Sequence, residues 1–265
     1  MEPLKERLRT TWMAGDFGKI AELSAKDAAA FVDVLDIKPG MRVLDVACGT
    51  GNLAIPAARK GAQVTGVDIA PNLLRQARHR ATEEGLQIEF EEGDAEDLPF
   101  PDAEFDVVMS MFGAMFAPDP DRIASEMTRV CRHGGIVAMA NWTPDGFVGK
   151  MFRLTSRFVP PPVEIPAPVL WGDAAVARLR LGSNGVDVKV RQRKILFDFP
   201  GPPHDVVEFF REYFGPTKVA FSRLDATTQN ALRDDLEKLW SENNLASDGK
   251  TRIENEYLEV IGTRL

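Results

Sequence analysis

The chain has few of the residues that build covalent frameworks or metal sites. It contains two cysteines and three histidines, and their spacing does not match a metal-binding pattern. Two cysteines are also too few to hold a fold together by disulfides. The sequence therefore predicts neither a bound metal nor a disulfide framework.

Long apolar stretches are missing as well. No segment reaches the roughly 18 consecutive apolar residues of a membrane-spanning helix. The amino end, residues 1–7, is charged and lacks the apolar centre of a secretory signal. We expect no membrane span and a cytoplasmic location.

Basic residues are outnumbered by acidic ones. The chain has 32 lysines and arginines against 40 aspartates and glutamates, a net charge of −8. A protein that follows a nucleic-acid backbone usually carries a basic face, so we expect a small-molecule partner and no nucleic acid. The apolar content of 44% is ample for the core of one enlarged α/β domain.

The most informative segment present is an apolar run that ends in a glycine turn, residues 43–51, Val-Leu-Asp-Val-Ala-Cys-Gly-Thr-Gly. The run is typical of a strand covered on both faces. Gly49 and Gly51 allow close backbone approach and positive φ angles before a helix. In a doubly wound sheet such a turn lies in the crevice at the carboxyl ends of the strands, where ligands bind.

A second acid follows this turn. Asp68 closes the next predicted strand, where a carboxylate can accept hydrogen bonds from the two vicinal hydroxyls of a ribose. The glycine turn also fits the loose G-x-G-x-x-A pattern of nicotinamide or flavin enzymes. The turn and Asp68 alone leave both kinds of nucleotide-type ligand open.

Two further acids favour a cofactor without phosphate. Asp45 lies just before the glycines, where it would repel a pyrophosphate but attract the cationic sulfonium and ammonium groups of S-adenosylmethionine. Asp94, after a third predicted strand, supplies an acceptor for an adenine amino group. Leu98 and Phe100 offer apolar cover beside it.

With these residues the chain resembles the class I S-adenosylmethionine-dependent methyltransferases, in particular the subgroup like the ubiquinone and menaquinone biosynthesis methyltransferases. The resemblance covers roughly residues 38–142. It rests on segments in the family's order and spacing: 43–51, 64–70, 93–100, 105–111 and 129–139.

The resemblance implies a set of cofactor-binding residues at the ends of successive strands. Asp45 and the backbone of the glycine turn would face the methionine part, Asp68 would bind the ribose, and Ile69 would pack on the adenine. Asp94 and the Ala95 backbone would read the adenine edge. The full set is Asp45, Ala47, Gly49, Thr50, Gly51, Asp68, Ile69, Asp94, Ala95 and Met111.

The function implied is methyl transfer from S-adenosylmethionine to a small molecule. The acceptor atom (O, N, C or S), the catalytic residues and the oligomeric state are open at this point. Two alternatives also stay open: a protein that binds S-adenosylmethionine without turnover, and, less favoured, a nicotinamide-dependent oxidoreductase.

The order of strand and helix patterns predicts the fold class α/β. We expect a doubly wound, Rossmann-like methyltransferase sheet, mostly parallel with an antiparallel last strand, in a single domain of residues 1–265. Its parts are amino-terminal helices over 1–37, a cofactor-binding core over 38–142, and carboxyl-terminal strands over 143–265 with a helical cap at about 200–250. The expected strands are 42–47, 63–68, 87–91, 105–111, 136–141, 186–199 and 254–263, and the amino-terminal helices are 3–13 and 17–35.

Bulky side chains after the fourth and fifth strands predict an apolar acceptor pocket. The helical insertion is long for a connection, so we interpret it as a cap over this pocket. We expect a neutral or cationic acceptor with an apolar body. The candidate pocket residues are Trp12, Phe17, Phe112, Met115, Trp142 and His204.

Overall fold

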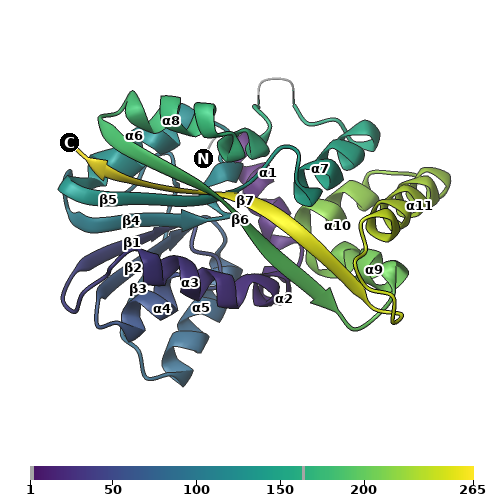
Figure 1. The fold of residues 1–265 in the computed structure, drawn as a ribbon, viewed down its shortest axis with the longest axis horizontal. Coiled ribbons are helices and arrows are strands. Elements are labelled where there is room, and N and C mark those ends of the chain that lie inside the picture. The colour runs from purple at the N-terminus through teal and green to yellow at the C-terminus, as the bar shows by residue number, and fades with distance from the viewer. Residues whose placement is uncertain (1–2, 163–164) are drawn as a thin grey trace.

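The computed structural model describes residues 3–162 and 165–265, which contain one seven-stranded sheet in the order β3-β2-β1-β4-β5-β7-β6 (Figure 1). Strands β1 to β5 are parallel, β7 is antiparallel to β5, and β6 is antiparallel to β7. The prediction of a mostly parallel sheet with an antiparallel end is confirmed. The strands are β1 (Arg42–Val46), β2 (Gln63–Asp68), β3 (Ile88–Glu92), β4 (Phe105–Met111), β5 (Cys131–Trp142), β6 (Val186–Phe199) and β7 (Thr251–Arg264).

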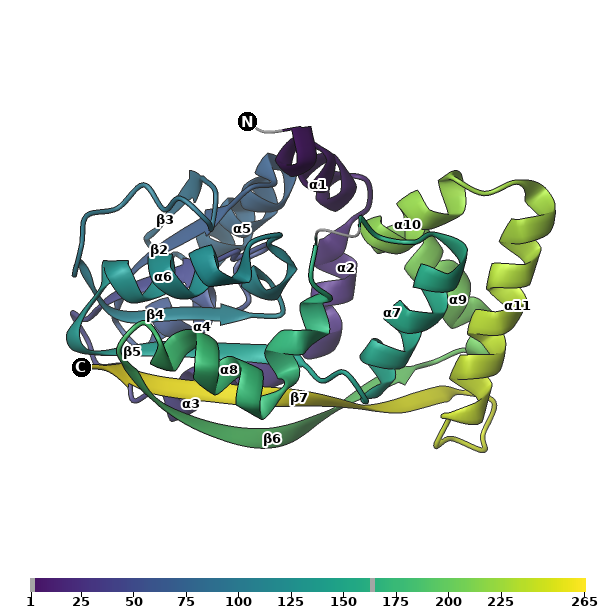
Figure 2. The same cartoon turned by 90° about the horizontal axis from the view of Figure 1, so that it is seen from above.

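Helices cover both faces of this sheet (Figures 1 and 2). One face carries α3 (Ala25–Val34), α4 (Ala54–Arg59) and α5 (Pro71–Glu83), and the other carries α6 (Pro120–Val130) and α8 (Ala174–Gly182). The central strands are buried on both sides, as the apolar run of β1 predicts. The carboxyl ends of β1, β2 and β4 are thereby held in a rigid frame.

The amino-terminal helices differ from the prediction of one helix over 17–35, which is wrong. Helix α1 (Pro3–Met13) is as predicted, but the next segment breaks into α2 (Phe17–Ala21), the 3-10 turn η1 (Glu22–Ser24) and α3. The Ser24 hydroxyl donates to the Ala21 carbonyl oxygen at 3.2 Å. Such a local bond competes with the regular helix pattern. The break turns α2 toward the carboxyl edge of the sheet.

The carboxyl-terminal part contains a long β6–β7 hairpin that projects beyond the sheet (Figure 2). Between the two strands the chain forms α9 (Pro203–Tyr213), α10 (Gly215–Ser222) and α11 (Ala226–Glu242), which lie beside α7 (Phe147–Phe158). We call α9 to α11 the cap. The sequence did not predict α10 or α8, although Asp173 accepts hydrogen bonds from the first backbone N–H groups of α8, a usual start signal.

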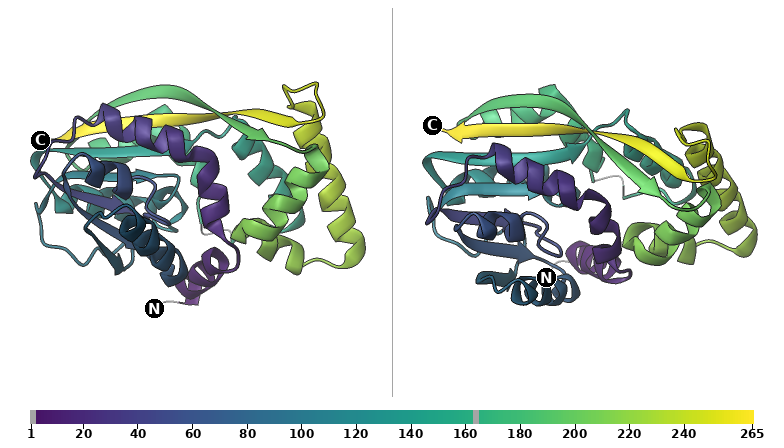
Figure 3. Two further views of the ribbon diagram at one scale, coloured as in Figure 1. Left: turned by 90° about the horizontal axis from the view of Figure 1, so that it is seen from below. Right: turned by 60° about the horizontal axis from the view of Figure 1, so that its bottom comes forward.

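The amino-terminal segment and the cap meet each other (Figure 3). The Asp16 backbone N–H donates to the Tyr213 carbonyl oxygen at 3.0 Å. A Cβ atom on Gly15 would overlap that same carbonyl, and one on Gly215 would overlap the Thr11 carbonyl. Glycine is therefore required at both positions for the two segments to approach this closely.

Candidate active site

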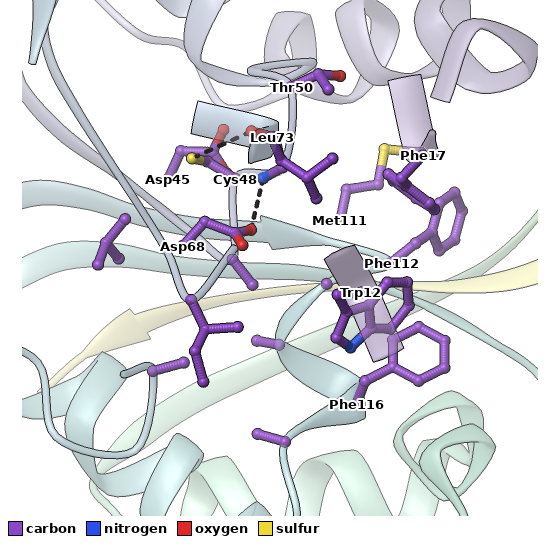
Figure 4. A pocket seen from close by; sticks show the side chains of 18 of the residues that line it. Trp12, Phe17, Asp45, Cys48, Thr50, Asp68, Leu73, Met111, Phe112 and Phe116 are labelled. Atoms are coloured by element: carbon purple, nitrogen blue, oxygen red, sulfur yellow. Dashed lines mark hydrogen bonds between the residues drawn. The ribbon is translucent and has the colours of Figure 1, made fainter. Parts of the chain in front are cut away.

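A cavity opens at the carboxyl ends of β1, β2 and β4, with a volume of about 120 Å³ (Figure 4). The glycine turn and the strand ends form one side, and α1 and α2 contribute Lys5, Leu8, Trp12 and Phe17. We call it the cofactor cavity. The expected cofactor residues that line it are Asp45, Ala47, Gly49, Thr50, Asp68, Ile69, Asp94, Ala95 and Met111.

The glycine turn holds its shape through positive φ angles at Ala47 (54°), Gly49 (53°) and Gly51 (82°). Gly51 does not line the cavity. A Cβ there would meet the Phe90 ring at 3.4 Å, so this glycine shapes the turn from behind.

Asp68 ties the turn to the end of β2. Its Oδ2 accepts the Gly49 backbone N–H at 2.8 Å, and its Oδ1 accepts the Ala70 backbone N–H at 2.8 Å. Burial raises the pKa of Asp68 to about 6, against the lowering effect of these hydrogen bonds. The group is therefore ionised at neutral pH, and each oxygen keeps a lone pair for a further donor from the cavity.

Asp45 lies deeper, with 1% of its surface exposed. Its Oδ2 accepts the backbone N–H of Ala54, the first residue of α4, at 3.0 Å. Burial raises the pKa of Asp45 well above its ordinary value, and the negative Asp68 nearby adds to the rise. Asp45 thus supports the start of a helix as well as lining the cavity.

Asp94 is joined to α1 by an ion pair that sequence reasoning missed. Lys5 Nζ lies 2.5 Å from Asp94 Oδ2 and 2.7 Å from Glu96 Oε2. One turn later Arg9 donates to the Ile69 carbonyl oxygen at 3.2 Å and pairs with Glu92 at 2.9 Å. The sequence did contain a signal for these ion pairs. Lys5 and Arg9 are four residues apart, so they share one face of a helix, and residues 91–97 are rich in acids that could pair with them.

A second cavity of about 50 Å³ adjoins the first and shares Phe17, Ser24, Phe112 and Phe116 with it. We call it the aromatic chamber. Its walls come from α2, the ends of β4 and β5, α7, β6 and the cap. The lining residues are Phe17, Ile20, Ser24, Phe112, Phe116, Trp142, Val148, Met151, Phe152, Phe197, Phe210 and Phe214.

Phe112 stands where the two cavities join. Its φ of 55° is rare for a bulky side chain, and such outliers gather at functional sites. The ring lies flat on Trp142, with 3.6 Å between centroids and 6° between planes. The chain can turn here because Gly113 follows, where a Cβ would overlap the Ala47 carbonyl. The turns after β1 and β4 therefore pack directly together.

The polar and aromatic halves of the site lie on opposite sides (Figure 4). Asp45 and Asp68 are on one side, and Trp12, Phe112 and Phe116 are on the other. Trp12 packs edge-on against Phe116 at 5.0 Å between ring centroids. The expected pocket residues Trp12, Phe17, Phe112 and Trp142 are thus brought together around the two cavities.

Met115 and His204 are not brought to either cavity. Met115 is 1% exposed and faces the core, because the 3-10 turn η2 (Ala114–Phe116) directs Phe116 rather than Met115 to the site. His204 lies on the cap surface, with Nδ1 2.7 Å from Glu237 Oε1. Neither residue lines the cofactor cavity or the aromatic chamber.

Comparison with known proteins agrees with this geometry. A family model described as a methyltransferase domain matches residues 43–135. An uncharacterized protein of Mycobacterium tuberculosis is 40% identical over 215 residues, which cover 80% of this chain and 78% of that protein. A demethylmenaquinone methyltransferase of Deinococcus radiodurans is 42% identical over 137 residues, or 50% of this chain and 56% of that enzyme. The solved structure of the YcgJ protein of Bacillus subtilis has a similar fold, with a TM-score of 0.65 and 17% identity over 90% of this chain and 98% of that one.

The fold, the glycine turn and these similarities define the class. The chain belongs to the class I S-adenosylmethionine-dependent methyltransferases. Its cofactor is S-adenosylmethionine, and its reaction is methyl transfer to a small-molecule acceptor. The similarities support neither of the alternatives that the sequence left open.

Two kinds of feature are absent from the described residues, 3–162 and 165–265. No helix there has the length and apolar character needed to cross a membrane. No group of three or more His, Cys, Asp or Glu side chains there could hold a metal ion.

Proposed function

We propose that the cofactor cavity binds S-adenosylmethionine and that the aromatic chamber receives the body of an uncharged, apolar acceptor. One observation carries this proposal: the ionised Asp68 and the glycine turn line a cavity that adjoins a chamber lined mainly by aromatic side chains. A polar donor and an apolar acceptor would then meet at Phe112.

The cofactor residues have distinct roles in this proposal. Asp68 accepts hydrogen bonds from the ribose hydroxyls with the lone pairs that its backbone partners leave free. Asp45 and the backbone of Ala47 to Thr50 surround the methionine part. Ile69 packs on the adenine, and Asp94 with the Ala95 backbone binds its edge. Gly51 supports the turn without touching the cofactor.

S-adenosylmethionine supplies the methyl group. An electron pair of the acceptor atom forms the new bond to this methyl carbon as the carbon–sulfur bond breaks. The electrons of the broken bond stay on sulfur. The protein's part is to hold the reacting atoms in line at roughly 3–3.5 Å and to exclude water. Phe112 lines both cavities, and Met111, the last residue of β4, lines the cofactor cavity beside it. They would align the acceptor with the methyl group.

None of the described residues that line the chamber has an acidic or basic side chain, and the one hydroxyl, that of Ser24, donates to the Ala21 carbonyl oxygen. Cys48 lines the cofactor cavity, but burial and the charges of Asp45 and Asp68 raise the pKa of its thiol well above the ordinary value. It stays a thiol and packs as a small apolar group. A hydroxyl or carbon acceptor would therefore have to lose its proton to water before or as the new bond to the methyl group forms.

We further propose that residues 1–265 act as one domain in which the amino-terminal helices and the cap close the site. The contacts of Gly15 and Gly215 with opposing backbone carbonyls support this, since they join the two closing segments. The cytoplasmic location stays a prediction.

The experiment is transfer of label from [methyl-³H]S-adenosylmethionine into small molecules of a metabolite extract. We expect labelled product with the parent protein and at least tenfold less with Asp68→Asn. Gly182→Ala is the matched control, because a Cβ there meets open space. Cofactor binding with no labelled product in any extract would contradict the proposed use of the chamber.

A further inference from the structure

We infer that Asn52 is a positioning residue: its side chain ties the bend between α2 and α3 to the glycine turn, and so controls how readily the cofactor enters and leaves. This inference rests on the proposed function, because it assumes that the amino-terminal helices close the cofactor cavity. It goes further by naming the contact that couples this closure to the turn on which the cofactor lies.

The bend leaves one backbone carbonyl without its usual helical partner. In an uninterrupted α-helix the Ala21 carbonyl oxygen would accept the Ala25 N–H. Here the Ala25 N–H donates to the Glu22 carbonyl oxygen instead, as in a 3-10 turn. The Ala21 oxygen is therefore free for side-chain donors and accepts two of them, the Ser24 hydroxyl at 3.2 Å and Asn52 Nδ2 at 2.8 Å. The shorter of the two bonds comes from the residue directly after the glycine turn.

The other end of the Asn52 amide is held by Arg80 in α5. Arg80 Nη1 donates to Asn52 Oδ1 at 2.9 Å and to the Thr50 carbonyl oxygen at 2.6 Å. An arginine can only donate, so the amide oxygen of Asn52 must face it and the amide nitrogen is left to face Ala21. One guanidinium thus holds the glycine turn and also orients the donor that reaches the bend.

This contact lies where the amino-terminal segment covers the cofactor cavity. Ala21 and Asn52 both line that cavity. A Cβ on Gly49 would lie 3.8 Å from the Phe17 ring, so α2 packs directly on the glycine turn. Trp12 in α1 meets Phe17 edge-on at 5.6 Å between ring centroids. Movement of Ala21 away from Asn52 would therefore take the covering aromatic side chains away from the turn.

Helix α2 depends on such contacts because it is short. It has five residues, and a helix of that length is not stable alone in water. A single hydrogen bond between neutral groups contributes modestly to stability, so it can break and form again as the cofactor enters and leaves. We therefore expect loss of the Asn52 donor to loosen α2 and η1 without unfolding the sheet.

The first test is hydrogen exchange of the full chain without cofactor. Asn52→Asp keeps an oxygen for Arg80 but replaces the donor to the Ala21 carbonyl by a second oxygen, which that carbonyl repels. We expect the amide hydrogens of residues 17–24 to exchange about tenfold faster than in the parent, and those of β4 and β5 to exchange at the parent rate. Faster exchange throughout the sheet would mean that Asn52 supports the whole fold, and would overturn the inference.

Two further variants control for charge and for the loss of any such bond. Asn52→Ala removes the donor without adding a charge, so it should show the same faster exchange at residues 17–24. Asn184→Asp is the matched control, because Asn184 Nδ2 donates to the Arg180 carbonyl oxygen at 2.8 Å at the end of α8, on the other face of the sheet. It should exchange like the parent. Parent-like exchange in both Asn52 variants would overturn the inference.

The second test separates positioning from simple contact with the cofactor. Trp12 lines the cofactor cavity, so stopped-flow tryptophan fluorescence should report the binding of S-adenosylhomocysteine. A looser amino-terminal segment admits and releases the cofactor more readily. We therefore expect the association and dissociation rate constants each to rise about threefold or more in both Asn52 variants, and neither to change in Asn184→Asp. A rise in the dissociation rate constant alone would mean that Asn52 only binds the cofactor, and would overturn the inference.

The same measurements separate this inference from the proposed function. Failure of S-adenosylhomocysteine to bind the parent protein counts against the cofactor assignment. Binding to the parent with unchanged rate constants in both Asn52 variants counts against the inference alone.

Discussion

Lys5 and Asp94 form an ion pair, 2.5 Å from Nζ to Oδ2, that fastens α1 to the acid expected to bind the adenine. Burial opposes the charge on Lys5, but hydrogen bonds to Asp94 and Glu96 outweigh it and raise the pKa of Lys5 above its ordinary value. The closing helix and the adenine end of the cavity are therefore one connected structure.

Lys5→Met should weaken S-adenosylhomocysteine binding about 2- to 5-fold, or about 0.5–1 kcal/mol, because a partly exposed pair contributes no more than that. Lys194→Met is the control, since Lys194 pairs with Glu254 at 2.6 Å on the distant β6–β7 hairpin and should leave affinity unchanged. Calorimetry measures both. Tighter binding by Lys5→Met would mean that Lys5 competes with the adenine for Asp94 instead of holding α1 against the cofactor cavity.

Asp68→Asn should weaken cofactor binding by about 1.5–3 kcal/mol at pH 7.5, because it removes a charged acceptor at the ribose. Asn is preferred to Ala here. Asp68→Ala would leave both the Gly49 and the Ala70 N–H groups without an acceptor and so destabilise the turn, whereas the Asn carbonyl oxygen can still accept one of them. Unchanged affinity in Asp68→Asn would show that the ribose anchor lies elsewhere.

Asp68 also predicts a pH dependence. Its pKa of about 6 in the folded chain lies above the ordinary 3.8. The neutral form thus favours folding, so this contribution to stability is present below about pH 4 and is lost as the pH rises through about 6. Cofactor binding runs the opposite way, because the ribose needs the charged form.

Affinity for S-adenosylhomocysteine should therefore fall as the pH drops below about 6, by up to tenfold per pH unit. Calorimetric titrations with S-adenosylhomocysteine at a series of pH values from 7.5 to 5 measure this change in affinity. Asp45, whose pKa burial also raises, is present in both parent and Asp68→Asn, so a difference between the two proteins isolates Asp68. An equal pH dependence in both proteins would assign the effect to another group.

Gly15→Ala should reduce methyl transfer at least tenfold and change cofactor affinity less than threefold. The added Cβ overlaps the Tyr213 carbonyl, a backbone atom that cannot move cheaply, so the amino-terminal segment and the cap must separate. Gly182→Ala, again with open space around the new atom, should behave like the parent. Full activity in Gly15→Ala would show that closure by these two segments is not needed.

His204→Ala should leave kcat/KM within about twofold of the parent. The side chain is exposed on the cap, and its raised pKa comes from the hydrogen bond and the charge of Glu237, not from a substrate site. Steady-state assays decide this. A tenfold loss would restore His204 to the acceptor site.

The parts predicted correctly from the sequence depend on local signals. The apolar run of β1 and the acid that ends β2 can each be recognised from a few consecutive residues. Together they predict that the cofactor cavity lies at the strand ends. The break between α2 and α3 was missed because the apolar spacing continues across η1. Only the packing of Phe17 against the site shows why the helix must bend there.

The chamber walls could not be read from the sequence in the same way. Phe197, Phe210 and Phe214 come from β6 and the cap, and the sheet register brings them to Trp142 from far along the chain. In sequence they look like ordinary core residues. Lys5 was missed for the same reason, because its partners Asp94 and Glu96 follow a different strand.

Calorimetric titration of the parent protein with S-adenosylmethionine, S-adenosylhomocysteine and NADH tests the central claim most directly. The account predicts binding of one equivalent of either sulfur cofactor and no measurable heat with NADH, because Asp45 and Asp68 line the cavity with acids that oppose a pyrophosphate. Tight NADH binding, with none for S-adenosylmethionine, would contradict the account.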